Sequence, residues 1–300
     1  MQSKNVFLES ISTITDFKTL ARTITLVEND THKGAELLRN LTIHNTPIIG
    51  ITGPPGAGKS TLLNALVHDL LQAGKRIGLI LVDPSSPFHF GALLGDRLRM
   101  TQHFMQPNLF IRSVASRGSL GGLSDKIIEI TEVMKAYPFD YIFVETVGVG
   151  QSEVEIAGLA DTTVVVLVPE AGDSVQAMKA GLMEIADLFV VNKSDRPDAE
   201  LFYNHLSQQL EINHRNHIPI LKTVASESLG IAELHAALQA LPKQIDNERK
   251  LLLLSSKVYR IIQQNRMKSF DKSRLHHALK EAVNLPHFSL FKFAFQFDDL

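Results

Sequence analysis

The sequence predicts a doubly wound α/β domain built on a mostly parallel sheet, with a helical segment before it and a helical arm after it. Two observations lead to this prediction. Between residues 47 and 242, short apolar runs bounded by Gly, Pro or Asp alternate with stretches of helical period. Successive residues of these runs are apolar, which is typical of parallel strands covered by helices on both faces. Such sheets bind ligands at the carboxyl ends of their strands.

The chain of 300 residues divides into three expected regions, 1–44, 45–242 and 243–300. Apolar residues recur at helical spacing in the first region, which is therefore expected to be helical. Seven expected strands lie in the second, at PIIGIT, RIGLILVD, LFIRSV, YIFVE, TTVVVLVP, LFVVNKSD and IPILKTVA. In the third, residues 247–264 and 273–283 are expected helices, and 288–297 fits either a strand or a helix. Its apolar, Phe-rich end favours a homodimer.

The bulk composition argues against several classes of protein. A formal net charge of −2 disfavours a surface for nucleic acid. The absence of cysteine excludes disulfides, thiolate metal sites and a cysteine nucleophile, and the 12 histidines are scattered. No apolar run is long enough to cross a membrane, and the N-terminus has no signal-peptide pattern. We therefore expect a cytoplasmic protein that binds neither nucleic acid nor a membrane.

A phosphate-binding motif follows the first expected strand. The run GPPGAGKS satisfies G-x-x-x-x-G-K-[ST] at every position, with a strand before it and a helix after it. Its backbone N–H groups surround phosphate, Lys59 supplies a positive charge and Ser60 is a magnesium ligand. The alternative, a glycine-rich turn with a chance lysine, does not explain this context. The expected cradle consists of Gly53, Pro54, Pro55, Gly56, Ala57, Gly58, Lys59, Ser60 and Thr61.

The run NKSD at the end of a later strand favours guanine over adenine. The Asp195 carboxylate can accept two hydrogen bonds from guanine that adenine does not offer, and the stem of Lys193 can cover the base. Asn192 begins the same motif. A second base contact, through backbone N–H groups, is expected at Val224, Ala225 and Ser226. The sequence therefore predicts GTP as substrate.

Three acids are candidates for the magnesium site. Glu145 ends the strand expected beside the phosphate-loop strand, and its contact with the cation can be direct or through water. Asp83 also ends a strand, and Asp96 lies further along. Gly148 would bring a backbone N–H to the γ-phosphate. The alternatives are a solvated acid for Glu145, a capping residue for Asp83 and a surface acid for Asp96.

Six motifs occur here in an order and spacing that resemble the MeaB/ArgK-type family, the methylmalonyl-CoA mutase-associated GTPases. They are GPPGAGKS, VDPSSP…LGDRLRM, SRGSLGGLS, ETVGVGQSE, PEAGDSVQAMKAGLMEIAD and NKSD, and the similarity spans roughly residues 30–235. In that family a strand-end glutamate replaces the aspartate of Ras-like GTPases, which matches Glu145.

The resemblance implies a GTPase chaperone that gates adenosylcobalamin delivery to a cobalamin-dependent acyl-CoA mutase and protects that enzyme. A cobalamin adenosyltransferase is a further partner that the sequence leaves open. The implied magnesium ligands are Ser60, Asp83, Asp96 and Glu145, and the implied catalytic residues are Lys59, Asp96, Glu145 and Lys179. Asp173, Gln176 and Lys179 match the partner-coupling loop. By spacing alone, these three would be a solvated helix face.

Other functions stay open at the level of sequence. A metallochaperone GTPase would need a His-rich or Cys-His segment, which this chain lacks. A small-molecule kinase or transport ATPase conflicts with NKSD. A nucleotide-dependent scaffold without turnover is the third alternative. Gln151 is a candidate to orient the attacking water, and nothing fixes the direction of Arg97 or Arg99, so we expect slow intrinsic hydrolysis that the partner raises.

Overall fold

The computed structural model describes residues 13–83, 106–115, 123, 126–147, 152–169, 181–241, 247–267, 270–285 and 288–298. The chain forms two compact units, residues 1–250 and 251–300. The expected region boundaries after residues 44 and 242 remain predictions. None of the helices within the described ranges has the length and hydropathy needed to cross a bilayer.

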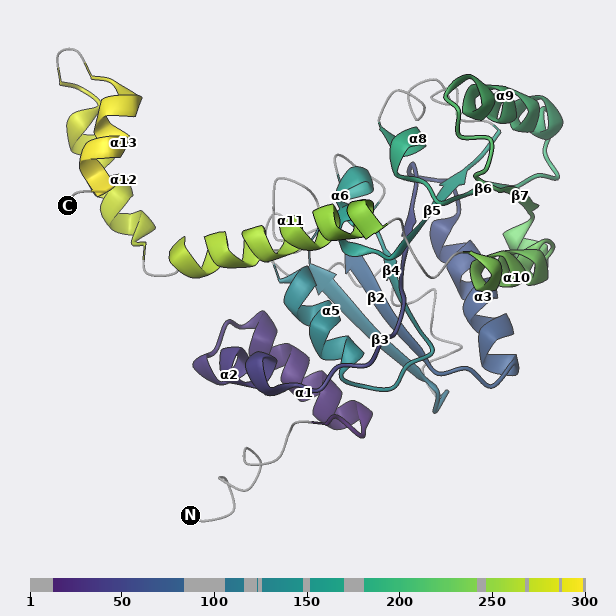
Figure 1. The fold of residues 1–300 in the computed structure, drawn as a ribbon, viewed down its shortest axis with the longest axis horizontal. Helices are drawn as coiled ribbons and strands as arrows, with labels where there is room; N and C mark the ends of the chain where they lie inside the picture. Colours follow the sequence, from purple (N-terminus) through teal and green to yellow (C-terminus); the bar gives the residue numbers. More distant parts are fainter. Residues whose placement is uncertain are drawn as a thin grey trace. The chain divides into compact units, whose positions relative to one another are not determined.

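The first unit is built on a seven-stranded sheet in which every strand pair is parallel (Figure 1). The strand order is β3-β2-β4-β1-β5-β6-β7, so the sheet is doubly wound around β1. The strands are β1 (Ile48–Thr52), β2 (Ile77–Asp83), β3 (Leu109–Ala115), β4 (Tyr141–Glu145), β5 (Thr162–Leu167), β6 (Leu188–Asn192) and β7 (Ile220–Thr223). The predicted fold class and its seven strands are confirmed.

Among the described helices of the first unit, two lie before β1 and the others follow strands in the expected alternation. They are α1 (Phe17–Glu28), α2 (His32–Asn40), α3 (Lys59–Gln72), α5 (Ile127–Lys135), α6 (Ser152–Leu159), α8 (Leu182–Ile185), α9 (Ala199–Ile212), the 3-10 helix η2 (Ala225–Glu227) and α10 (Ile231–Ala240). Helices α3 and α10 lie side by side at one side of the sheet (Figure 1). They pack on apolar residues such as Ile51, Leu81 and Phe143. Glu145, two residues after Phe143, faces the same side because strand side chains alternate.

Helix α6 packs on the opposite face of β1, where Gly50 makes the close approach possible. A Cβ atom at Gly50 would lie 2.4 Å from Cγ1 of Ile156 in α6, which is closer than two carbon atoms can come. Ile156 itself is fully buried. Strand β1, which leads into the phosphate loop, therefore has α3 packed on one face and α6 packed on the other.

Aspartates set the register at the amino ends of three strands. Each lies just before its strand and makes two hydrogen bonds with one residue of a neighbouring segment. Its carboxylate accepts the backbone N–H of that residue, and its own backbone N–H donates to the carbonyl of that residue. The pairs are Asp140 with Arg76, Asp161 with Ile48 and Asp187 with Thr163, with N–H to carboxylate distances of 2.8, 2.9 and 2.8 Å. These bonds satisfy backbone donors that start a strand and would otherwise need water.

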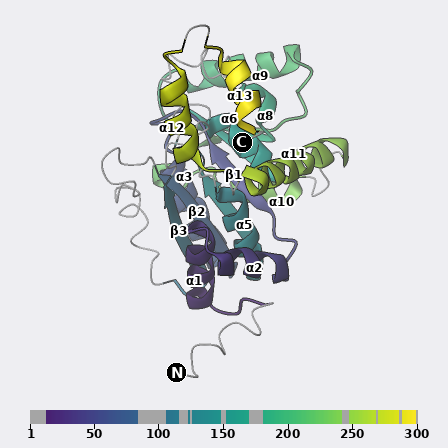
Figure 2. The same cartoon turned by 90° about the vertical axis from the view of Figure 1, so that its left-hand side faces the viewer.

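The N-terminal helices pack on α5 and on the edge strand β3, beside which Figure 2 shows α1. Arg112 of β3 donates to Glu28 at 2.5 Å and to Thr25 at 3.3 Å, both in α1. Lys126, before α5, donates to Asp30 at 3.0 Å. Burial alone would lower the pKa of Lys126, but the bond to Asp30 and the nearby acids outweigh it and raise this pKa. The helical N-terminal segment is thus an integral layer of the first unit.

The regular structure described for the second unit is all helical. It contains most of α11 (Asn247–Arg266), together with α12 (Lys272–Ala282) and α13 (Leu290–Asp298). The run 288–297, which fits a strand or a helix by sequence, is therefore mostly helical. Many of its large apolar side chains are exposed, among them Leu252, Tyr259, Leu290, Phe291 and Phe295. Homodimer formation through this arm remains a prediction.

Candidate functional site

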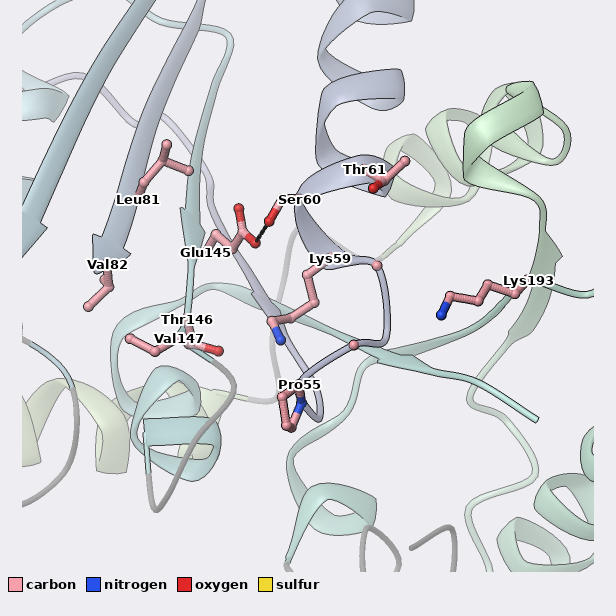
Figure 3. A pocket seen from close by; sticks show the side chains of 12 residues that line it. Pro55, Lys59, Ser60, Thr61, Leu81, Val82, Glu145, Thr146, Val147 and Lys193 are labelled. Atoms are coloured by element: carbon pink, nitrogen blue, oxygen red, sulfur yellow. Dashed lines mark hydrogen bonds between the residues drawn. The ribbon is translucent and has the colours of Figure 1, made fainter. Parts of the chain in front are cut away.

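A cavity of about 550 Å³ opens at the carboxyl ends of β1, β2 and β4 (Figure 3). This is the edge of the sheet at which the sequence predicts ligand binding. The phosphate loop, the start of α3, the end of β4 and one residue after β6 all contribute to its wall. The lining residues are Pro55, Gly56, Gly58, Lys59, Ser60, Thr61, Leu81, Val82, Glu145, Thr146, Val147 and Lys193.

The phosphate loop turns at Gly58 and leads directly into α3. Gly58 is the N-cap residue of α3, with φ of 84°, a left-handed conformation that costs glycine little. A Cβ atom there would lie 2.5 Å from Nδ2 of Asn192, so a side chain has no room either. Helix α3 begins at Lys59 and its positive end faces the cavity, as an anion site requires.

The Lys59 ammonium group lies within the phosphate loop. Its Nζ atom donates to the carbonyl oxygen of Gly53 at 2.9 Å and to that of Pro54 at 3.1 Å. Only 6% of the residue is exposed, and it lines the cavity. The two carbonyls hold the positive charge at the loop, where a bound phosphate would compete with them as a stronger, charged acceptor.

Glu145 reaches the start of α3. Strand β4 lies directly beside β1, as expected, with Glu145 paired to Ile51. The Ser60 hydroxyl donates to Oε1 of Glu145 at 2.6 Å, a bond drawn in Figure 3. A hydroxyl and a carboxylate that meet at the cavity wall are the hard oxygen donors that Mg²⁺ prefers. The described part of the expected magnesium set therefore fits that ion.

Asp83 ends β2 on the same face as Glu145. Leu81 pairs with Glu145 in the parallel ladder, and Asp83 lies two residues further along β2. It is 1% exposed. Among the described residues, the cavity lining includes Leu81 and Val82 but not Asp83. Ligation of a cation by Asp83 therefore remains a prediction.

Asn192 connects the phosphate loop to the segment expected to contact the base. Its Nδ2 donates to the carbonyl oxygen of Ala57 at 2.9 Å. Its Oδ1 accepts from the Thr223 hydroxyl and from the Ala225 N–H, both at 3.1 Å. The residue is 2% exposed, so these three bonds satisfy an amide that water does not reach.

The remaining base-side residues are arranged around Asn192. Lys193 takes a left-handed φ of 56°, lines the cavity and extends into it in Figure 3. Asp195 is exposed at the loop beyond it. The N–H groups of Val224 and Ala225 donate within the protein, to Leu229 and Asn192 respectively. Two of the three backbone donors expected for the base are therefore used within the protein. Ser226 is the remaining candidate to donate its N–H to the base.

Several expected site residues lie outside the described part of the chain. They are Asp96, Gly148, Gln151, Asp173, Gln176 and Lys179, together with Arg97 and Arg99. Their roles remain predictions. The sequence reasoning in turn missed four residues of the cavity wall, namely Leu81, Val82, Thr146 and Val147. Thr146 could have been found from its position, because it directly follows the acid that ends β4.

Comparisons with known proteins agree on a family. The model of the family described as methylmalonyl-CoA mutase-associated GTPase MeaB matches residues 20–282. A Pyrococcus horikoshii protein named as a candidate GTPase is 48% identical over 244 residues, 79% of this chain and 77% of that protein. The mitochondrial methylmalonic aciduria type A homolog of Mus musculus is 31% identical over 294 residues, 89% and 70% of the two chains. The crystal structure of a LAO/AO transport system kinase superposes with a TM-score of 0.63 and 28% identity, covering 94% of this chain and 92% of that one.

Proposed function

Because this chain belongs to the MeaB family of methylmalonyl-CoA mutase-associated GTPases, we propose that it gates adenosylcobalamin delivery to a cobalamin-dependent acyl-CoA mutase and protects that enzyme. The chain is a P-loop GTPase by family and fold. The family name and the methylmalonic aciduria type A homolog support a mutase as the partner. The observation that carries the nucleotide part is the cavity enclosed by the phosphate loop, Glu145 and Lys193.

Positioning and charge would supply the catalysis. The ammonium of Lys59 would exchange its two loop carbonyls for oxygens of the β- and γ-phosphates, and the N-terminus of α3 would face the same oxygens. Asp96, Glu145 and Lys179 are the further catalytic residues of this proposal. Water would attack the γ-phosphoryl group in line with the leaving oxygen, and Gln151 is the proposed residue to orient it.

Ser60, Asp83, Asp96 and Glu145 would hold Mg²⁺, and the Ser60–Glu145 pair supports this assignment. When bound, the ion neutralises charge on the β- and γ-phosphate oxygens. Gly148 would donate its N–H to the γ-phosphate. The loss of that phosphate on hydrolysis would release the loop, which gives the partner a signal to respond to.

The partner would read this signal through the coupling residues Asp173, Gln176 and Lys179. Homodimer formation would use the helical arm, whose exposed apolar side chains support a protein contact. A cobalamin adenosyltransferase as a third component is part of the same proposal. The expected intrinsic hydrolysis is slow because no arginine is among the described residues that line the cavity, and the mutase would raise it.

Hydrolysis of GTP by the purified chain, alone and with methylmalonyl-CoA mutase, tests the proposal, with ATP as the nucleotide control. A Lys59→Ala variant controls for contaminating phosphatase activity. Slow turnover of GTP alone that rises several-fold with the mutase supports both the nucleotide and the partner. Turnover that the mutase leaves unchanged would remove the partner from the proposal while keeping the GTPase.

A further inference from the structure

Two buried hydroxyl groups join the ends of β1 and β4, and one of them belongs to Thr146, which lines the nucleotide cavity. Thr52 is the last residue of β1 and Thr146 is the first residue after β4. The Thr146 hydroxyl donates to the Thr52 hydroxyl at 3.0 Å. The two residues are 0% and 2% exposed, so water cannot replace this bond.

The bond continues the parallel ladder by one step. The last ladder pair between these strands is Ile51 with Glu145, and the Thr146 N–H donates to the Ile51 carbonyl at 3.0 Å. Thr52 still pairs with Val165 of β5, but the ladder between β1 and β4 ends at Ile51 and Glu145, and the side-chain bond is the next connection between these two strands. It therefore fixes the start of the phosphate loop at Gly53 relative to Thr146 and Val147 of the cavity wall.

A second hydrogen bond, from Ser60 to Glu145, attaches the other end of the phosphate loop to β4. Thr52 precedes the phosphate motif and Ser60 ends it. Thr52 bonds to Thr146, and Ser60 bonds to the adjacent Glu145 at 2.6 Å. Both ends of the phosphate loop are thus attached to one dipeptide at the end of β4. Of the two attachments, the threonine pair is the one that uses no proposed magnesium ligand.

We propose that Thr146 and Thr52 form a positioning pair for GTP hydrolysis, holding Thr146 and Val147 of the cavity wall at a fixed distance from the phosphate loop. Neither hydroxyl touches the nucleotide in this proposal, so the pair acts on the reacting geometry rather than on affinity. Small displacements of reacting groups cost rate steeply, because alignment supplies much of the rate enhancement. The proposal rests on GTP hydrolysis by the chain and is independent of the mutase.

Valine substitutions test this pair, since valine has the shape of threonine without the hydroxyl. Thr146→Val is expected to lower kcat about tenfold while KM for GTP changes by less than about twofold. Thr146→Ser keeps the hydroxyl and is expected to restore most of the rate. Thr131→Val is the matched control, because Thr131 is buried in α5 and its hydroxyl donates to the carbonyl of Ile128 at 2.7 Å, away from the cavity wall.

The double variant Thr52→Val with Thr146→Val separates positioning from stability. Each single change leaves one buried hydroxyl without its partner, whereas the double change removes both, so the melting temperature is expected to recover. The low kcat is expected to persist in the double variant. A kcat that recovers together with the melting temperature, or a Thr146→Val kcat equal to that of the Thr131→Val control, would overturn the proposal. All rates are measured on the full chain without the mutase.

Discussion

Replacing Asn192 by alanine tests whether this amide holds the phosphate loop to the segment expected to contact the base. The side chain makes three hydrogen bonds, to Ala57, Thr223 and Ala225, and is buried. A buried hydrogen bond contributes about 1 kcal/mol net, so the three together predict a loss of about 3 kcal/mol in the free energy of unfolding. Ala57, Thr223 and Ala225 are themselves buried, so water does not replace the hydrogen bonds that the substitution removes.

Urea denaturation of Asn192→Ala and of a control, Thr46→Val, measures this loss. Thr46 is buried and its hydroxyl makes one bond, to the Phe139 carbonyl at 3.0 Å, at the amino edge of the sheet. The control is expected to lose about 1 kcal/mol and to bind GDP normally. Asn192→Ala should lose about three times as much and bind a fluorescent GDP analogue at least about tenfold more weakly, since 1.4 kcal/mol is a factor of ten. An unchanged GDP affinity, or a stability loss no larger than that of the control, would refute the reasoning.

Three further outcomes are expected. Asp195→Asn should exchange the preferred nucleotide from GTP to xanthosine triphosphate, because an amide pairs with the N1–H and O2 of xanthine; steady-state kinetics with both nucleotides checks it, and retained GTP preference would contradict the assignment. Asp161→Ala should lower the free energy of unfolding by about 1–2 kcal/mol through loss of the bond to Ile48, while leaving the GTPase KM unchanged. A chain ending at residue 246 should be monomeric by light scattering and still hydrolyse GTP; if the full chain is also monomeric, the dimer proposal fails.

The sequence predicts the strands and the phosphate loop well because their signals are local. Each strand is a short apolar run with a breaker at its end, and the motif from Gly53 to Ser60 specifies a loop and a helix start by itself. The position of Glu145 beside that loop followed from the order of the strands. The contacts Thr52–Thr146 and Asn192–Ala57 could not be predicted, because they join residues 94 and 135 positions apart. Only the pairing of strands and loops in space brings them together.

The Phe-rich segment shows why a period of two can mislead. Phenylalanine occurs at 291, 293, 295 and 297, an alternation typical of a strand. In a helix the same spacing also places rings four residues apart on one side. The structure has two such pairs, Phe291 with Phe295 and Phe293 with Phe297, each with ring centroids 5.9 Å apart. The alternation therefore supports a helix with two aromatic rows as well as it supports a strand.

The missing side chain at Gly50 makes the junction between α6 and the phosphate-loop strand mechanically stiff. Most contacts between a helix and a sheet pass through two side chains, either of which can change rotamer and absorb a shift. Here the side chain of Ile156 packs against the main chain of Gly50, which cannot change rotamer. The surrounding interior is closely packed and has low compressibility. A displacement of α6 toward the sheet must move the backbone of β1 itself, at the residue that pairs with Val144 of β4 and two residues before Thr52, which bonds to Thr146.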